Sequence, residues 1–248
     1  YSIEQTDFLF LTWWTPLYYK YIMTMSSELS VTVPLDYPIN INQSEGLNYE
    51  IKEDERQITY FWKSIATEAP KEEIFSPPIE ELIPAVAITP LNFKYGIKGS
   101  HHSWATFGLW LQELNSGNDE LTQPEKFETG RLTRGLSSEV EIIKTLYHYL
   151  QDKTTYVNVT LAEGGLKSYP ASYVCENKYG DCKALTTYMK AMLNHAGIAS
   201  VYTIVSAGRN ETGINTNFPG QQFNHVFLVV PLDGDTIWLE NTSNTTPF

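Results

Sequence analysis

The chain has 248 residues, of which 42% are hydrophobic and 13% aromatic, so it can form one large domain or two modest ones. Its net charge of −12, from 29 acidic and 17 basic residues, argues against nucleic acid or an anionic membrane surface as a partner. No segment approaches the roughly 20 apolar residues of a membrane span. Because the chain begins at Tyr1, we expect a fragment or a mature form.

Residues 1–98 are expected to form an antiparallel β-sandwich, which could be incomplete at its N-terminal end. The stretches YKYIMTMSSELSVTVP and ERQITYFWKSIA are rich in aromatic and β-branched residues and are separated by turn residues. Five prolines between residues 70 and 90 then exclude a long helix. No catalytic cluster is recognisable in this half.

Residues 99–136 are expected to be a transitional or linker segment. HSWATFGLWLQEL is compatible with a short helix, whereas NSGNDELTQPEKFETG is polar, contains glycine and proline, and predicts a loop. The adjacent His101 and His102 have no cysteine or histidine at ligand spacing nearby. They are therefore expected to be surface or loop residues, and no metal site is predicted.

From residue 137 the pattern changes to α+β. Ser138 and Glu141 have the spacing of a capping box ahead of the helix that IIKTLYHYLQ predicts. EGGLKSYPASYVCENKYG is expected to be a long loop. DCKALTTYMKAMLNH then predicts a helix, with Asp181 as its N-cap and Gly197 as its C-terminal stop. SVYTIVSA predicts a strand after that helix.

Cys182 would occupy the first turn of the helix that follows Asp181. The unpaired N–H groups and the positive end of the helix dipole stabilise a thiolate at this position. Cysteine is nevertheless among the most buried residue types and is usually inert. The position alone therefore does not establish a nucleophile.

FNHVFLVVPLDGDTIWLENT predicts a β-hairpin that turns at Asp233-Gly234. With a two- or four-residue loop, His225 faces residue 242, and Glu240 is its diagonal neighbour on the same face. A three-residue loop would place Glu240 on the opposite face. In the favourable register, Cys182, His225 and Glu240 supply a nucleophile, a base and an orienting acid, as acyl-transfer enzymes require.

Three stretches, YGDCKALTTYMKAMLNHAGI, FNHVFLVV and TIWLENT, together resemble the transglutaminase-like superfamily, a branch of the papain-like cysteine fold. The resemblance implies that Cys182 is the nucleophile, His225 the base and Glu240 the orienting acid, and this chemistry needs no metal or organic cofactor. The sequence departs from the family at two positions: it has Glu240 where aspartate is usual, and Ala184 where relatives often have aspartate.

The oxyanion donors are less well defined by the sequence. The Cys182 N–H is one candidate, because N–H groups at a helix start point outward. Tyr173 and Asn177 could contribute a second donor, although such loop residues more often make structural turn contacts. Trp238 lies on the same face as Glu240 and could cover it, but a core tryptophan is the more common role.

The upstream stretch RQITYFWKSIATEAPKEEIFSPPIEELIPAVAIT resembles the β-rich domain of unknown function that precedes transglutaminase-like domains in many exported bacterial proteins. The two resemblances imply a β-sandwich domain over residues 1–98, a linker over 99–136 and a papain-like, transglutaminase-like α+β catalytic domain over 137–248. They also imply export to the periplasm or the cell surface.

The implied reaction is cysteine-dependent acyl transfer, through a thioester, on a protein or peptide amide. Water as the acceptor gives a protease or amidase, an amine gives a transglutaminase, and the sequence does not choose between them. The expected partner is a protein or peptide substrate, with a glycan or cell-wall peptide as further options, and no nucleic acid. The alternative is a catalytically degenerate module that binds a peptide or glycan as an adaptor.

Overall fold

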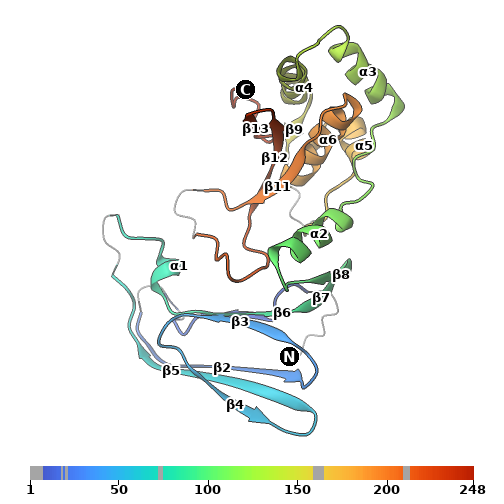
Figure 1. Cartoon of the computed structure of the whole chain (residues 1–248). Coiled ribbons are helices and arrows are strands. Elements are labelled where there is room, and N and C mark those ends of the chain that lie inside the picture. Colours follow the sequence, from blue (N-terminus) through green and yellow to red (C-terminus); the bar gives the residue numbers. More distant parts are fainter. Residues whose placement is uncertain (1–7, 18, 20–21, 72–74, 159–164, 209–212) are drawn as a thin grey trace. The chain divides into compact units, whose positions relative to one another are not determined.

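The computed structural model describes residues 8–17, 19, 22–71, 75–158, 165–208 and 213–248 (Figure 1). The strands are β1 (Thr12–Trp14), β2 (Thr24–Pro34), β3 (Ile39–Gln43), β4 (Tyr49–Glu53), β5 (Gln57–Thr67), β6 (Val86–Pro90), β7 (Asn92–Tyr95), β8 (Ile97–Ser100), β9 (Thr155–Tyr156), β10 (Tyr179–Gly180), β11 (Val201–Val205), β12 (His225–Leu232) and β13 (Asp235–Leu239). The helices are α1 (Ile79–Leu82), α2 (Trp104–Leu114), α3 (Gln123–Thr133), α4 (Glu139–Lys153), α5 (Ala171–Asn177) and α6 (Cys182–His195).

The chain divides into two compact units. The first comprises the described residues of Tyr1–Trp110 and Gly208–Gln222, and the second those of Leu111–Ala207 and Phe223–Phe248. Gly208 and residues 213–222 thus belong to the first unit, although the described segments before and after them belong to the second. Compactness does not show which segments fold alone, so the predicted domain boundaries stay a prediction.

The first unit contains the expected β-sandwich. Strands β2, β5 and β4 form one antiparallel sheet, and β1, β6 and β3 form another, which lies opposite it in Figure 1. Trp62 of β5 and Val86 and Ile88 of β6 are buried together between side chains from both sheets. The indole N–H of Trp62 donates a hydrogen bond of 2.9 Å to Gln43, which satisfies its polar atom in this core.

His101 and His102 lie in a loop, as one of the two expectations had it, and His102 is exposed, but His101 is not at the surface. His101 is buried, and its ring lies 4.2 Å from that of Phe93 and 5.4 Å from that of Phe107, measured between centroids. Its Nδ1 pairs with the Pro90 carbonyl at 2.8 Å. Burial lowers the pKa of His101, so the ring is a neutral part of the core.

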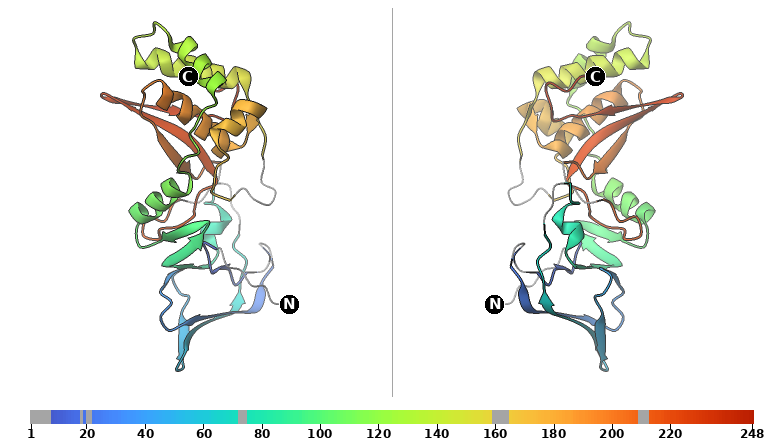
Figure 2. Two further views of the ribbon diagram at one scale, coloured as in Figure 1. Left: turned by 90° about the vertical axis from the view of Figure 1, so that its right-hand side faces the viewer. Right: turned by 90° about the vertical axis from the view of Figure 1, so that its left-hand side faces the viewer.

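The second unit is α+β, as expected. Strands β11, β12 and β13 form an antiparallel sheet, and helices α4, α5 and α6 lie to one side of it in the side views (Figure 2). Leu228, Val230 and Leu239 on the inner face of the sheet join the apolar side of α6 in one buried cluster. The α6 boundaries are confirmed: Asp181 caps its start, and Gly197, with φ of +81°, follows its end.

Two local predictions in this unit were wrong. Ser138 is at the N-cap of α4, but its side chain makes no capping hydrogen bond. The expected long loop before α6 contains helix α5, which ends at Lys178 in the left-handed conformation, with φ of +58°. Ala171, Val174 and Cys175 are buried in the same cluster as α6. Tertiary packing therefore stabilises a helix in a segment whose glycines and proline predict a loop.

Helix α3 lies within the segment expected to be a linker, and its Glu125 is buried in the second unit. The carboxylate accepts hydrogen bonds from Tyr149 of α4, at 2.9 Å, and from Tyr188 of α6. Lys178, at the end of α5, forms an ion pair with it at 2.8 Å. Glu125 therefore joins α3, α4, α5 and α6, and the loop expected in this polar sequence contains a helix instead.

Candidate active site

Cys182 is the first residue of α6 and is partly exposed. The buried Asp181 before it accepts a hydrogen bond of 2.9 Å from the Ala184 N–H and forms an ion pair of 2.5 Å with Lys183. A Cβ atom on Gly180 would lie only 2.8 Å from the Cβ of Ala184. Gly180 is therefore needed for close packing and Asp181 for capping, and together they place the Cys182 thiol at the positive end of the helix dipole.

The hairpin has the register that places His225 and Glu240 together. Strands β12 and β13 pair Leu232 with Asp235, so the turn contains only residues 233 and 234. This is the expected two-residue turn, and Gly234 has a φ of +78°, which glycine adopts readily. The Nε2 of His225 lies 2.7 Å from the Oε2 of Glu240, so the longer acidic side chain reaches the imidazole.

The largest influence on the ionisation of His225 is hydrogen bonding with the Cys182 side chain. Together with the hydrogen bond to Glu240, it raises the pKa of His225 to about 9, although burial acts in the opposite direction. Glu240 engages Nε2, so Nδ1 is the ring nitrogen that does not contact this carboxylate. The structure thus brings together the three residues that the sequence singled out.

Glu240 is itself held in place by groups that the sequence analysis did not assign. Its Oε1 accepts hydrogen bonds from the Thr242 N–H at 2.9 Å and from the Thr242 hydroxyl at 2.6 Å. Tyr147 of α4 donates a hydrogen bond of 2.8 Å to the Glu240 carbonyl. Burial would raise the pKa of Glu240, but the bonds with His225 and Thr242 outweigh it, so the net pKa is lowered.

Other sequence candidates lie in different surroundings. Tyr173 donates its hydroxyl to that of Tyr179 at 2.7 Å, and the Asn177 side chain bonds to the Tyr173 carbonyl at 2.8 Å. Both are therefore engaged locally around α5, as structural turn residues are. The expectation of a core tryptophan was wrong, since Trp238 is 62% exposed and packs its ring 5.3 Å from that of Phe227.

The second cysteine differs from Cys182 in its environment. Cys175 lies on α5 and is buried. Burial raises the pKa of its thiol, with smaller opposing contributions from hydrogen bonds to Thr122. Cys175 is therefore a structural cysteine.

Two tyrosines near Cys182 were also missed by the sequence analysis. Tyr156 of β9 pairs with Gly180 of β10, and Tyr202 lies on β11. Burial raises the pKa of both phenols, and the charges of Cys182 and Asp181 raise it further. Their positions depend on strand pairing between distant segments, so no local pattern marks them.

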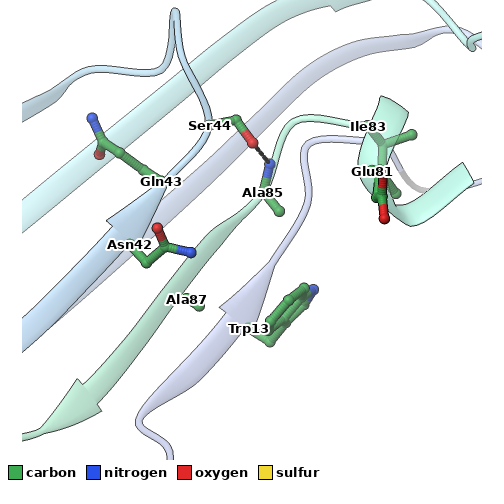
Figure 3. Close-up of a pocket in the computed structure, with 8 residues that line it drawn as sticks. All are labelled: Trp13, Asn42, Gln43, Ser44, Glu81, Ile83, Ala85 and Ala87. Carbon is green, nitrogen blue, oxygen red and sulfur yellow. Dashed lines mark hydrogen bonds between the residues drawn. The ribbon is translucent and has the colours of Figure 1, made fainter. Parts of the chain in front are cut away.

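The first unit contains a pocket of about 310 Å³, which is separate from this chemistry (Figure 3). It is lined by Trp13, Asn42, Gln43, Ser44, Glu81, Ile83, Ala85 and Ala87. The Ser44 hydroxyl accepts the Ala85 N–H at 2.9 Å, and the Gln43 amide bonds to the Leu47 carbonyl at 2.6 Å. These polar groups already serve the fold, and Glu81 is the one ionisable residue among those that line the pocket.

Comparison with known families agrees with this geometry. Residues 128–240 match the sequence profile of the Transglutaminase-like superfamily. No curated protein matches the sequence. In the described part of the chain, no helix is both long and apolar enough to span a membrane.

Similar solved structures include a candidate protease from Parabacteroides distasonis, with a TM-score of 0.65 and 18% sequence identity over 87% of this chain. The match covers 40% of that protein, so this chain spans less than half of its length. A candidate cysteine protease from Cytophaga hutchinsonii has a TM-score of 0.39 and 10% identity, over 88% of this chain and 72% of that one. The periplasmic domain of TgpA from Pseudomonas aeruginosa has a TM-score of 0.37 and 9% identity, over 94% and 76%.

Proposed function

We propose that the protein catalyses acyl transfer through a thioester on Cys182, and the match of residues 128–240 to the transglutaminase-like superfamily supports this proposal. The observation that carries this proposal is the chain of contacts from Cys182 to His225 and from His225 to Glu240, the second contact being 2.7 Å. A nucleophile, a base and an acid that orients the base in one hydrogen-bonded series are the parts that this chemistry needs.

The first half of the reaction forms the thioester. Because the pKa of His225 is about 9, its imidazole is protonated at neutral pH. In the proposed reaction Cys182 attacks as a thiolate beside this imidazolium. The sulfur adds to the carbonyl carbon of an amide, and the electron pair of the C=O bond moves to oxygen. When this intermediate collapses, the C–N bond breaks, and His225 gives its proton to the departing amine.

The second half releases the acyl group. The now neutral His225 takes a proton from the acceptor as the acceptor attacks the thioester, and the C–S bond breaks to restore the thiolate. Glu240 stabilises the imidazolium in both halves, and Thr242 keeps the carboxylate facing the ring. Water as the acceptor makes the protein a protease or amidase, and an amine makes it a transglutaminase.

The proposal is tested by trapping the acyl-enzyme. The protein is incubated with glutamine-containing peptides, quenched in acid and examined by mass spectrometry for a thioester on the Cys182 peptide. The adduct should form in the wild type and in Cys175→Ala, and it should be absent in Cys182→Ala. If no peptide acylates the wild type and casein is neither cleaved nor modified, the enzyme proposal is wrong and the adaptor module is favoured.

The acceptor is identified with casein and a fluorescent primary amine. Incorporation of the amine indicates a transglutaminase, whereas release of peptides or ammonia without incorporation indicates a hydrolase. Export to the periplasm or the cell surface, and a protein, peptide or cell-wall peptide as substrate, stay predictions from the sequence resemblance. Fractionation of the native host, followed by immunodetection, tests the first of these.

A further inference from the structure

Attack on a carbonyl places a negative charge on oxygen beside the Cys182 sulfur, and this oxyanion needs hydrogen-bond donors. The N–H of Cys182, in the first turn of α6, is one such donor, because the first N–H groups of a helix have no partner within it. Tyr173 and Asn177, the sequence candidates for a second donor, are engaged with neighbours around α5. Another group must therefore supply the second hydrogen bond.

Strand pairing brings Tyr156 to this place. Strand β9 runs parallel to β10, and Tyr156 pairs with Gly180, two residues before Cys182. The Val157 N–H donates a hydrogen bond of 2.9 Å to the Gly180 carbonyl, and the Thr155 N–H donates one of 3.0 Å to the Lys178 carbonyl. Paired strands lie about 4.8 Å apart, so the backbone of Tyr156 is fixed beside Gly180, two residues before Cys182.

The side chain of Tyr156 projects toward the start of α6. Paired residues in a ladder project to the same side of it, and a Cβ atom on Gly180 would lie 2.8 Å from the Cβ of Ala184, in the first turn of α6. Apart from burial, the influences on the pKa of the Tyr156 phenol are the charges of Cys182, Asp181, Lys183 and Glu240.

The Tyr156 hydroxyl is available as a hydrogen-bond donor. Its residue is 41% exposed, and among the described residues no hydrogen bond involves its phenol oxygen. Burial raises its pKa, with further increases from Cys182 and Asp181, so the hydroxyl keeps its proton at neutral pH. Tyr202, which the same two charges affect, has instead a buried hydroxyl without a partner in the described part of the chain, where a substrate cannot reach it.

We propose that Tyr156 is a further catalytic residue, whose hydroxyl donates the second hydrogen bond to the oxyanion as the Cys182 sulfur adds to a carbonyl. The inference rests on the proposed thioester chemistry. It predicts that Tyr156 assists reactions that pass through an oxyanion and leaves other reactions of the same thiol unaffected.

The test compares two reagents on the same sulfur. p-Nitrophenyl acetate acylates a thiolate through a tetrahedral oxyanion: the C–S bond forms, the C–O bond to the leaving group breaks, and p-nitrophenolate departs. Iodoacetamide alkylates the thiolate by direct displacement of iodide and forms no oxyanion. Both rates are measured on the Cys182 peptide by mass spectrometry, with Cys182→Ala as the background.

In Tyr156→Phe, acylation by p-nitrophenyl acetate should slow by at least about tenfold, since one oxyanion donor is worth a factor of this order or more. Alkylation by iodoacetamide should stay within about twofold of the wild type, because the thiolate itself is unchanged. Tyr202→Phe is the matched control and should leave both rates unchanged, because it removes a phenol hydroxyl that no substrate reaches.

The outcomes separate the inference from the proposed function. If wild-type Cys182 is not acylated at all, the proposed function fails. If the wild type is acylated and Tyr156→Phe matches it, or if Tyr156→Phe slows acylation and alkylation equally, Tyr156 is not an oxyanion donor. A selective loss of acylation in Tyr156→Phe, absent from Tyr202→Phe, supports the proposal.

Discussion

Replacement of Glu240 by glutamine tests how much the carboxylate raises the pKa of His225. Glutamine has nearly the same shape, and its amide oxygen can still accept the Thr242 N–H and hydroxyl, which bond to Glu240 at 2.9 and 2.6 Å. The change removes the negative charge 2.7 Å from the Nε2 of His225. Its effect should therefore appear in the ionisation of His225 rather than in the packing of the hairpin.

The magnitude follows from the His225 environment. A pKa of about 9 against the ordinary 6.5 corresponds to about 3 kcal/mol in favour of the protonated ring. The hydrogen bond with Cys182 is the largest contribution and that with Glu240 the next, and the His225 side chain is only 20% exposed. We therefore assign about 1 to 2 kcal/mol to Glu240, and the pKa of His225 should fall by about 1 in Glu240→Gln.

The same interaction gives a pH-dependent difference in stability. A histidine whose folded-state pKa is raised stabilises the fold fully below its unfolded pKa, and this contribution is lost as the pH rises through the folded pKa. Glu240, whose folded-state pKa is lowered, stabilises the fold above its ordinary pKa, and this stabilisation is lost as the pH falls through the lowered pKa. The wild type should therefore exceed Glu240→Gln in free energy of unfolding by about 1 to 2 kcal/mol near pH 6, with little difference at pH 10.

The assay is NMR of the histidine Cε1–H signals across pH, with His225 assigned from the spectrum of His225→Asn. Urea unfolding at pH 6 and pH 10, followed through the folded-state His225 signal, gives the stability difference. Glu128→Gln is the control, because Glu128 is bonded to Arg131 on the surface rather than to a histidine. An unchanged His225 pKa in Glu240→Gln, or a stability difference as large at pH 10 as at pH 6, would refute this reasoning.

Three further outcomes are expected. At pH 7, iodoacetamide should modify Cys182 before Cys175, whose thiol is buried with a raised pKa, and equal rates in peptide mass spectrometry would contradict the assignment of the nucleophile. Thr242→Val should lower kcat/KM by about three- to tenfold through loss of its hydroxyl bond to Glu240, as measured with any substrate that the trapping experiment identifies, whereas Thr242→Ser should retain activity. Gly180→Ala should destabilise the fold by about 1 to 3 kcal/mol because its Cβ would lie 2.8 Å from Ala184, whereas Gly130→Ala in α3 meets nothing within 4 Å and should be neutral or stabilising in thermal unfolding.

The sequence by itself determined the features that depend on near neighbours along the chain. The start of α6 follows from Asp181, whose side chain reaches an N–H only three residues ahead. The hairpin turn follows from Asp233-Gly234, and the structure selects the two-residue loop among the loop lengths that the sequence left open. With that loop, the side-chain period of two places His225 and Glu240 on one face, and their catalytic roles stay a proposal.

Only the tertiary structure decided the features whose partners are remote in the sequence. Helices α3 and α5 form in segments whose local signals predict loops, because Glu125, Lys178 and Tyr188 meet from three different helices. Tyr156 reaches the site through a parallel pairing with Gly180, which no local pattern encodes. A contact between residues that are distant in the sequence depends on how the whole chain packs. A hydrophobic pattern or a turn motif, by contrast, predicts only the helix, strand or turn in which it occurs.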